Sequence, residues 1–258
     1  VVFHIPTLTD LDYRSLPWLH ARKQPGQVWV MFSAESAVNY PAMSNPEFTR
    51  MFDLEMSYRQ SADVWTPYLD TSLDADLRAA TVLPKRHFAA AFISSAYDRS
   101  GRAEYLSELM KYMPVHSYGK LLNNRTDADL GQGAGIDGAR AKLQILSHYR
   151  FSLAFENSIA TDYVTEKFYQ PLRVGSTPVY LGAANISEFA PAPGSYVDVT
   201  DFSDPKALAA HLLALDEQDC QQWRRQPQSA ALTDKLSRLA CQQNTFAALC
   251  QKINQVQS

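Results

Sequence analysis

The chain has 258 residues, of which 46% are hydrophobic and 20% charged, with a formal net charge of −3 at pH 7. This composition is typical of a folded globular protein rather than a disordered chain. It also offers no basic face for binding nucleic acid, because no block of like charges occurs. No apolar run approaches the ~18 residues that a membrane-spanning helix needs.

The two ends of the sequence bear on where the protein is located. The chain opens at Val1 directly in an apolar run, so no signal peptide is visible, and we expect that an anchor or targeting segment has been lost. Cys220, Cys241 and Cys250 lack the spacing of a zinc site and are expected to be buried free thiols. Free thiols favour a reducing compartment. We therefore expect a cytoplasmic or membrane-peripheral protein in a bacterium, or a protein of the Golgi lumen in a eukaryote, with the bacterial case favoured.

Short apolar runs alternate with amphipathic stretches, a pattern typical of βαβ units and parallel sheets. The first predicted strand covers residues 28–32, and Phe32-Ser-Ala-Glu-Ser36 follows it, which places Glu35 in a loop after a strand. The next strand is predicted at residues 87–93, a continuous apolar run of the kind that is covered on both faces of a sheet.

Further elements follow in the second half of the chain. Helices are predicted at residues 101–113 and 206–215, the latter after Asp204, a cap residue, and a proline suited to the first helical position. The remaining predicted strands cover residues 151–155, 178–181 and 196–199.

A domain boundary is predicted near residues 84–86, where a polar stretch meets the apolar strand at 87. Residues 1–85 would form an N-terminal domain that lacks one or two strands and is therefore incomplete. Residues 86–220 would form a complete Rossmann-like domain. Residues 221–258, which are rich in glutamine with spaced leucine and phenylalanine, would form one or two terminal helices that pack on the body.

The segment from 155 to 168 runs from the end of a strand through a polar loop into a predicted helix capped by Asp162. Ligands of open α/β sheets bind outside the carboxyl ends of the strands, where such loops lie. Tyr163, Glu166 and Lys167 are spaced i, i+3, i+4 and would share one face near the helix N-terminus. The buried face is predicted to consist of Val164, Phe168 and Leu172, spaced i, i+4, i+8.

A face with this composition suits a nucleotide. The free N–H groups of a helix N-terminus favour phosphate, a carboxylate suits ribose hydroxyls, and a cation suits a diphosphate. The alternative is a solvated face with an ordinary ion pair, and spacing alone favours that alternative.

Several motifs together resemble the α-1,3/4-fucosyltransferases. The central ones are Phe155-Glu-Asn-Ser158, Asp162-Tyr-Val-Thr-Glu-Lys167 and Gly175-Ser-Thr-Pro-Val-Tyr-Leu-Gly182. Supporting matches occur at Ser57-Tyr-Arg59 with Asp63-Val64 and Pro67-Tyr68, and at residues 111–119 and 198–202. The matches occur in the family's order and run from about Val1 to Trp223.

The resemblance implies a GT-B glycosyltransferase in which two Rossmann-like domains face each other and the C-terminal one holds GDP-fucose. By motif position, Asn157, Tyr163, Glu166 and Lys167 would line the donor site. Arg102, in Ser100-Gly-Arg102, matches a family arginine that contacts the diphosphate.

Glu35 matches the family's catalytic base, although Ala37 replaces the proline of the family's motif and changes the expected loop shape. Fucose is β-linked in GDP-fucose and α-linked in the product, so one inverting displacement suffices. Glu35 would take the proton from the acceptor hydroxyl, the 3-OH (or 4-OH) of N-acetylglucosamine in an N-acetyllactosamine-type glycan. Cations at Arg102 and Lys167 would stabilise the departing GDP.

Two other functions stay open: a GT-B transferase for another nucleotide sugar, and an inactive glycan- or nucleotide-binding homologue, which the change at Ala37 motivates. No cofactor and no metal are expected. Asp74-Ala-Asp76 and Asp127-Ala-Asp129 resemble metal-binding DxD motifs, but neither follows a convincing strand. The glycines of residues 131–135 lack the features of a P-loop.

Overall fold

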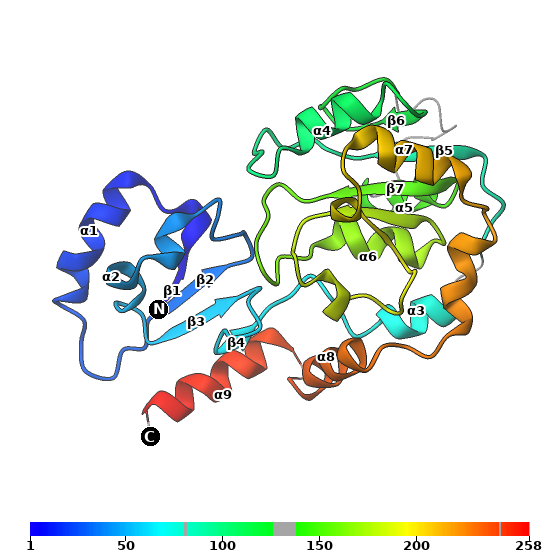
Figure 1. Ribbon diagram of the computed structural model, residues 1–258. Helices are drawn as coiled ribbons and strands as arrows, with labels where there is room; N and C mark the ends of the chain where they lie inside the picture. Colours follow the sequence, from blue (N-terminus) through cyan, green and yellow to red (C-terminus); the bar gives the residue numbers. More distant parts are fainter. Residues whose placement is uncertain (80–81, 126–137, 243, 258) are drawn as a thin grey trace.

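The computed structural model describes residues 1–79, 82–125, 138–242 and 244–257, and its described strands form two all-parallel sheets. Figure 1 shows the two sheets in neighbouring halves of the molecule, each with helices packed on it. The predicted α/β architecture with parallel sheets is therefore confirmed.

The first sheet has the order β1-β2-β3-β4. Its strands are β1 (Val2–His4), β2 (Val30–Ser33), β3 (Leu54–Ser57) and β4 (Val64–Trp65). One face packs on helices and 3-10 turns that follow β1 and β2: η1 (Ile5–Thr7), α1 (Asp10–His20), η2 (Pro41–Ser44) and α2 (Pro46–Thr49). Helix α1 begins where Thr9 and Asp12 cap each other's backbone N–H groups in a capping box.

The opposite face of the first sheet is covered from the far end of the chain. Helix α9 (Thr245–Gln257) packs Ala248 and Leu249 against Val30, Leu54 and other buried strand residues. Figure 1 shows this helix, in red, crossing back toward the blue strands. The C-terminal helix therefore completes the core of the N-terminal sheet, so residues from the two ends of the chain share one hydrophobic core.

The second sheet has the order β6-β5-β7-β8-β9. Its strands are β5 (His87–Ala91), β6 (Val115–Ser117), β7 (Tyr149–Phe155), β8 (Thr177–Leu181) and β9 (Val197–Asp198). Phe151, Leu153 and Phe155 of β7 point to one face, while Ala154 points to the other, as the period of two in a strand requires.

Helices cover both faces of this sheet. On the face of Phe151 lie α4 (Arg102–Leu109) and α7 (Pro205–Ala214). On the opposite face lie α3 (Leu73–Ala79), α5 (Gly138–Leu146), α6 (Glu166–Arg173) and α8 (Ala230–Cys241). Short 3-10 turns complete the chain at η4 (Ile186–Glu188), η5 (Val199–Asp201) and η6 (Asp219–Arg225).

The predicted strands are all present, with ends displaced by up to two residues. The helix predicted at 206–215 is confirmed as α7, whose N-cap Asp204 accepts from the backbone N–H of Ala207. The predicted terminal helices are α8 and α9. The three cysteines are free, as predicted, but the prediction that all are buried is wrong, because Cys241 and Cys250 are exposed and Cys220 alone is buried.

The prediction that Asp162 caps the helix is also wrong. Helix α6 begins at Glu166, and its N-cap is Thr165, whose hydroxyl accepts from the N–H of Lys167. Asp162 lies three residues earlier with φ of 67°, in the left-handed region. Its carboxylate instead accepts from the backbone N–H and side-chain amide of Gln60, and its own N–H donates to Asn185. Tyr163 therefore precedes the helix and does not share a helical face with Glu166.

Candidate functional site

The second sheet reverses its strand order between β5 and β7. From β5 the chain moves outward to β6, then returns to form β7 on the other side of β5, so α4 and α5 lie on opposite faces. Ligands of such sheets bind beyond the carboxyl ends of the strands at this point of reversal. The segments that leave β5 and β7 here carry Arg102 and the residues from Glu156 to Lys167.

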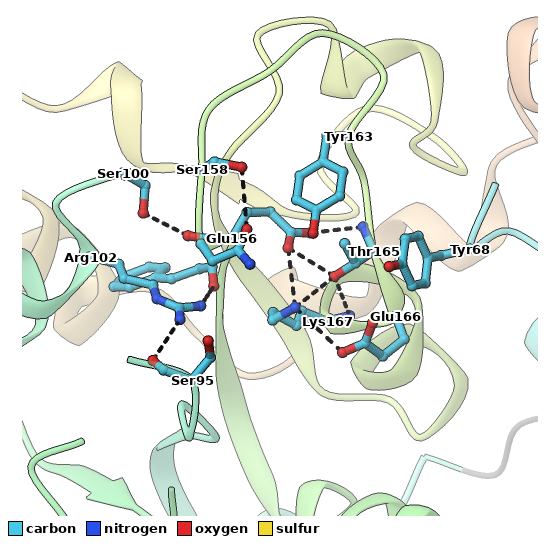
Figure 2. Close-up of polar contacts among 12 residues, drawn as sticks. Tyr68, Ser95, Ser100, Arg102, Glu156, Ser158, Tyr163, Thr165, Glu166 and Lys167 are labelled. Carbon is cyan, nitrogen blue, oxygen red and sulfur yellow. Dashed lines mark hydrogen bonds and ion pairs between the residues drawn. The ribbon is translucent and has the colours of Figure 1, made fainter. Parts of the chain in front are cut away.

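Glu156, the first residue after β7, is fully buried. Its carboxylate accepts from the backbone N–H and the hydroxyl of Thr165, both at 2.8 Å, and pairs with the Lys167 ammonium at 3.3 Å. Figure 2 shows these contacts joining the end of the strand to the start of α6. A glycine is required at position 182, because a Cβ there would lie 2.4 Å from the Tyr180 hydroxyl oxygen and 2.8 Å from Cγ of Glu156.

Burial raises the pKa of Glu156, and the Lys167 ammonium opposes that shift. Burial alone would lower the pKa of Lys167, but the carboxylates of Glu156 and Glu166 outweigh it and raise that pKa. Lys167 is therefore a firmly charged ammonium, which also contacts the hydroxyl of Thr165 at 2.9 Å. The Glu156 pair fixes a positive charge at the N-terminus of α6, where the free N–H groups already favour anions.

Glu166 lies beside Lys167, 3.4 Å from its ammonium, and its side chain is 41% exposed. Burial raises its pKa, but the ammonium groups of Lys167 and Lys142 lower it overall. Lys142, on α5, lies over the ring of Phe92 at 5.6 Å. A second lysine thus adds positive charge on this side of the sheet, and the sequence pattern gave no signal for it.

Arg102 is 1% exposed at the start of α4. Its guanidinium donates to the carbonyl of Phe155 at the end of β7, and to the carbonyls of Ser95 and Tyr97 after β5. Figure 2 shows the guanidinium between these two segments. Arg102 thus ties together the two strand ends at which the order reverses, and its Nε has no hydrogen-bond partner among the residues that the structure describes.

Asn157 is 9% exposed, and its backbone carbonyl accepts from the N–H of Arg99 at 2.7 Å. Its side-chain oxygen accepts from the Ser158 hydroxyl. The hydroxyl of Ser100 donates to the carbonyl of Glu156 at 2.6 Å. The loop after β5 is therefore fastened to the loop after β7 by backbone contacts as well as by Arg102.

Glu35 lies on the other half of the molecule, two residues after β2. Its backbone N–H donates to the hydroxyl of Ser33, and its carboxylate accepts from the Tyr163 hydroxyl at 3.0 Å. The N–H of Ala37 donates to the Tyr58 hydroxyl at 3.1 Å. Proline has no N–H, so the residue expected from the family's motif could not make this contact. The departure at Ala37 therefore comes with a hydrogen bond that holds the loop.

The structure brings most of the predicted site residues together in two groups. Glu166 and Lys167 lie side by side at α6, and Arg102 lies at the neighbouring strand ends together with Asn157. Tyr163 instead contacts Glu35. The prediction that Tyr163 shares a helical face with Glu166 is therefore wrong. Sequence reasoning missed Glu156, although a carboxylate directly after an apolar strand, with a lysine in the following helix, was a usable signal.

The two Asp-Ala-Asp pairs are the residues that resemble metal-binding DxD motifs. Asp74 pairs with Arg78 and Asp76 with Arg173, so arginines occupy both carboxylates. Asp127, Asp129 and the glycines of 131–135 lie outside the described residues. Within the described ranges, no group of three or more histidine, cysteine, aspartate or glutamate side chains is arranged to hold a metal ion.

None of the helices in the described part of the chain is both long and apolar enough to cross a membrane.

Comparison with known families gives a match over nearly the whole chain. The family model described as glycosyltransferase family 10 (fucosyltransferase) C-term matches residues 82–258. The model described as fucosyltransferase, N-terminal, matches residues 1–69.

Individual relatives belong to the same kind of protein as the family models. The chain is 35% identical over 225 residues to GDP-fucose protein O-fucosyltransferase 3 of Xenopus laevis, covering 82% of this chain and 46% of that protein. It is 34% identical over 199 residues to alpha-(1,3)-fucosyltransferase B of Drosophila melanogaster, covering 72% of this chain and 45% of that protein. The chain thus spans about half the length of these curated relatives. Both are animal proteins, so the expectation that favoured a bacterial source has no support.

Solved structures show the same fold. The crystal structure of an alpha1,3-fucosyltransferase with GDP-fucose superposes with a TM-score of 0.59 at 16% identity, covering 93% of this chain and 88% of that one. The corresponding structure with GDP gives a TM-score of 0.57 at 16% identity, with the same coverage. These neighbours confirm the predicted GT-B fold.

The buried ion pair gives a test of how the site is held together. Glu156→Gln should lower the free energy of unfolding by about 3 kcal/mol, because it leaves the Lys167 ammonium without its buried counter-charge. Urea unfolding at neutral pH measures this. Glu166→Gln is the matched control: it removes a carboxylate beside the same ammonium, but from a partly exposed position, and should cost less than about 1 kcal/mol. Equal losses in the two variants would contradict a special role for the buried pair.

Proposed function

The chain belongs to glycosyltransferase family 10, the fucosyltransferases, and from this premise we propose that it transfers L-fucose from GDP-β-L-fucose to a hydroxyl group with inversion at the fucose carbon. The observation that carries the proposal is the fixed ammonium of Lys167 at the N-terminus of α6, beside the strand-order reversal, in a chain that both family models match. This arrangement suits a nucleoside diphosphate.

We propose that Lys167 faces the diphosphate of the donor, and that Arg102 adds positive charge from the neighbouring strand ends, where three backbone carbonyls hold its buried guanidinium. Lys167 has an ammonium held by Glu156 and is therefore in place before the donor arrives. A preorganised cation stabilises the charge that grows on the leaving group without reorganising at the moment of reaction. Glu166, which is partly exposed beside Lys167, would accept from ribose hydroxyls, and Asn157 and Tyr163 would complete the donor site.

Glu35 is the proposed general base. In the reaction, the acceptor oxygen forms a bond to the anomeric carbon of fucose, and the bond from that carbon to the diphosphate oxygen breaks. The electron pair of the broken bond leaves with GDP, and the acceptor proton passes to the Glu35 carboxylate. The Glu35 side chain is half-buried, and its carboxylate accepts a hydrogen bond from the Tyr163 hydroxyl. This contact fixes the orientation of the carboxylate that would take the proton.

Two acceptor classes are proposed. The sequence motifs favour the 3-OH (or 4-OH) of N-acetylglucosamine in an N-acetyllactosamine-type glycan. The relatives at 34–35% identity include proteins named as GDP-fucose protein O-fucosyltransferase 3. These names favour a hydroxyl group of a protein as the acceptor. The same displacement serves both acceptors.

The animal relatives support a proposed location of the protein in the lumen of the endoplasmic reticulum or Golgi.

Release of GDP from GDP-fucose decides between these acceptors. Purified protein is incubated with the donor and with either N-acetyllactosamine or a panel of folded protein domains, and the fucosylated product is identified by mass spectrometry. GDP-mannose and UDP-N-acetylglucosamine serve as alternative donors. Turnover with another donor alone would indicate a transferase for a different sugar, and binding of GDP without turnover on any acceptor would indicate an inactive homologue.

We also propose that the reaction needs no metal ion, because lysine and arginine would stabilise the leaving diphosphate. Addition of EDTA should leave most of the activity in the GDP-release assay. Complete loss that Mn²⁺ restores would contradict this proposal and return attention to the Asp-Ala-Asp pairs, including the one at 127–129.

Two substitutions separate binding from chemistry. Glu35→Gln keeps the size of the side chain but cannot take a proton, so kcat should fall by roughly 10²–10⁴ while GDP affinity stays close to that of the parent protein. Lys167→Ala removes a cation that acts on GDP in the ground state and the transition state, so it should weaken GDP binding and also lower kcat. Calorimetric titration with GDP and steady-state kinetics measure both. A Glu35→Gln protein with full activity would exclude Glu35 as the base.

A further inference from the structure

Lys142, on α5, carries an ammonium that has no role in the reaction described above. Its side chain is half-buried, and among the described residues the ammonium has neither a hydrogen bond nor an ion pair. It lies over the ring of Phe92, 5.6 Å from the centroid. The ring attracts the cation but offers no lone pair to its N–H donors. Because a cation withdrawn from water needs acceptors, this ammonium marks a place where an acceptor group of a ligand would bind.

The ring under Lys142 belongs to an aromatic pair at the carboxyl ends of two strands. Phe92 directly follows β5 and Tyr118 directly follows β6, so the pair continues the ladder between these strands. The two rings stack, with centroids 5.0 Å apart and planes 13° apart. The N–H of Tyr118 donates to the carbonyl of Ala91, and its hydroxyl contacts that of Tyr149 at 2.7 Å. The pair is therefore fixed, and it places Lys142 at the sheet edge where ligands of open α/β sheets bind.

The charged groups around Lys142 are those of the proposed donor site. Burial lowers the pKa of Lys142, and among the charged groups Glu166 opposes that shift most strongly, while Lys167 adds to it. Glu166 also contacts the Lys167 ammonium at 3.4 Å. Glu166 thus lies between two lysines, each of which lowers its pKa. A nucleoside diphosphate joins three parts in a row, and Lys167, Glu166 and Lys142 offer a cation, a carboxylate and a cation in the same succession.

We propose that Lys142 binds the base of the donor nucleotide and selects guanine over adenine. This inference rests on the proposed function, in which Lys167 faces the diphosphate and Glu166 the ribose. Guanine carries two acceptors, O6 and N7, on one edge, and a lysine ammonium donates to both. Adenine keeps N7 but has an amino group in place of O6, and this amino group is a donor. Because Lys142 has donors and no acceptor, it distinguishes the two purines at this edge.

The half-buried position of Lys142 makes this contact selective. Water competes less for an ammonium that is partly withdrawn from solvent, so a hydrogen bond to the base contributes more to affinity than it would at an exposed site. The Phe92 ring restricts the directions that the ammonium can take, and a donor that is already positioned loses less conformational freedom on binding. A base without the acceptor would leave the ammonium unpaired, which is how a polar site rejects a ligand.

Lys142→Met tests the proposal because it keeps an unbranched side chain over Phe92 and removes the ammonium. The Kd for GDP should rise roughly 10- to 100-fold, whereas the Kd for ADP should change by less than about 2-fold. Inosine diphosphate, which keeps O6 and N7 but lacks the 2-amino group of guanine, should lose as much affinity as GDP does. Calorimetric titration with each nucleotide measures these constants without turnover, and the melting temperature of the same preparation shows that the variant is folded.

Three further variants serve as controls. Arg140 lies two residues earlier on α5 and its side chain is exposed, so Arg140→Met should leave the affinities for GDP and ADP close to those of the parent protein. Lys167→Ala removes a proposed phosphate contact and should weaken the binding of GDP and ADP by the same factor. Lys142→Arg keeps two N–H donors for O6 and N7 and should retain most of the preference for GDP.

Several results would overturn the role of Lys142. An equal loss of affinity for GDP and ADP in Lys142→Met would place the ammonium at the phosphates or the ribose. A loss for GDP without a loss for inosine diphosphate would exclude the contact with O6 and N7. A parent protein that prefers GDP, with the same preference in Lys142→Met, would refute the role of Lys142 alone. A parent protein that binds GDP, ADP and UDP equally would instead refute the proposed GDP-fucose donor, and the guanine contact would fail with it.

Discussion

A fully buried carboxylate organises the proposed donor side of this protein. Glu156 follows the central strand of the second sheet and cannot reach water, so its charge requires partners inside the protein. The N–H and hydroxyl of Thr165 and the ammonium of Lys167 supply them. Because these partners are the N-cap and first turn of α6, the same interaction decides where that helix begins. The loop from 157 to 164 must then span the fixed distance from the end of β7 to the N-cap of α6, and Gly182 leaves room for the side chains of Tyr180 and Glu156.

That loop also joins the two halves of the molecule. Its Asp162 is held by Gln60 from the first half and Asn185 from the second, and its Tyr163 packs in the core of the first sheet. Helix α9 makes a second connection, since it covers a face of the N-terminal sheet from the C-terminal end of the chain. Both connections bury apolar surface, which makes the relative position of the two sheets a property of the packed core. The proposed base on one sheet and the proposed cations on the other depend on this arrangement.

The sequence predicted much of this architecture for a physical reason. Short, mainly apolar runs such as residues 151–155 are typical of strands covered on both faces of a sheet, and this one is found as the central strand β7. The cap at Asp204 and the proline after it act within one turn of helix, so α7 was predictable to within a residue. The spacing of Val164, Phe168 and Leu172 identified a buried set correctly, because side-chain burial follows hydrophobicity even where the first of them precedes the helix.

The amino-acid pattern therefore predicts the local and periodic part of the structure: which runs are strands, where α7 is capped, and that Glu166 and Lys167 lie together beyond β7. The remaining features depend on contacts between residues far apart in the chain. Helix α6 is capped by Thr165 and not by Asp162. The buried Glu156 carboxylate accepts from Thr165 and holds it in place, and Asp162 is bound by Gln60, from more than a hundred residues away. Tyr163 meets Glu35 rather than Glu166 for the same reason, since a hydrogen bond between the two halves depends on how the sheets pack, and no spacing along the chain encodes that distance.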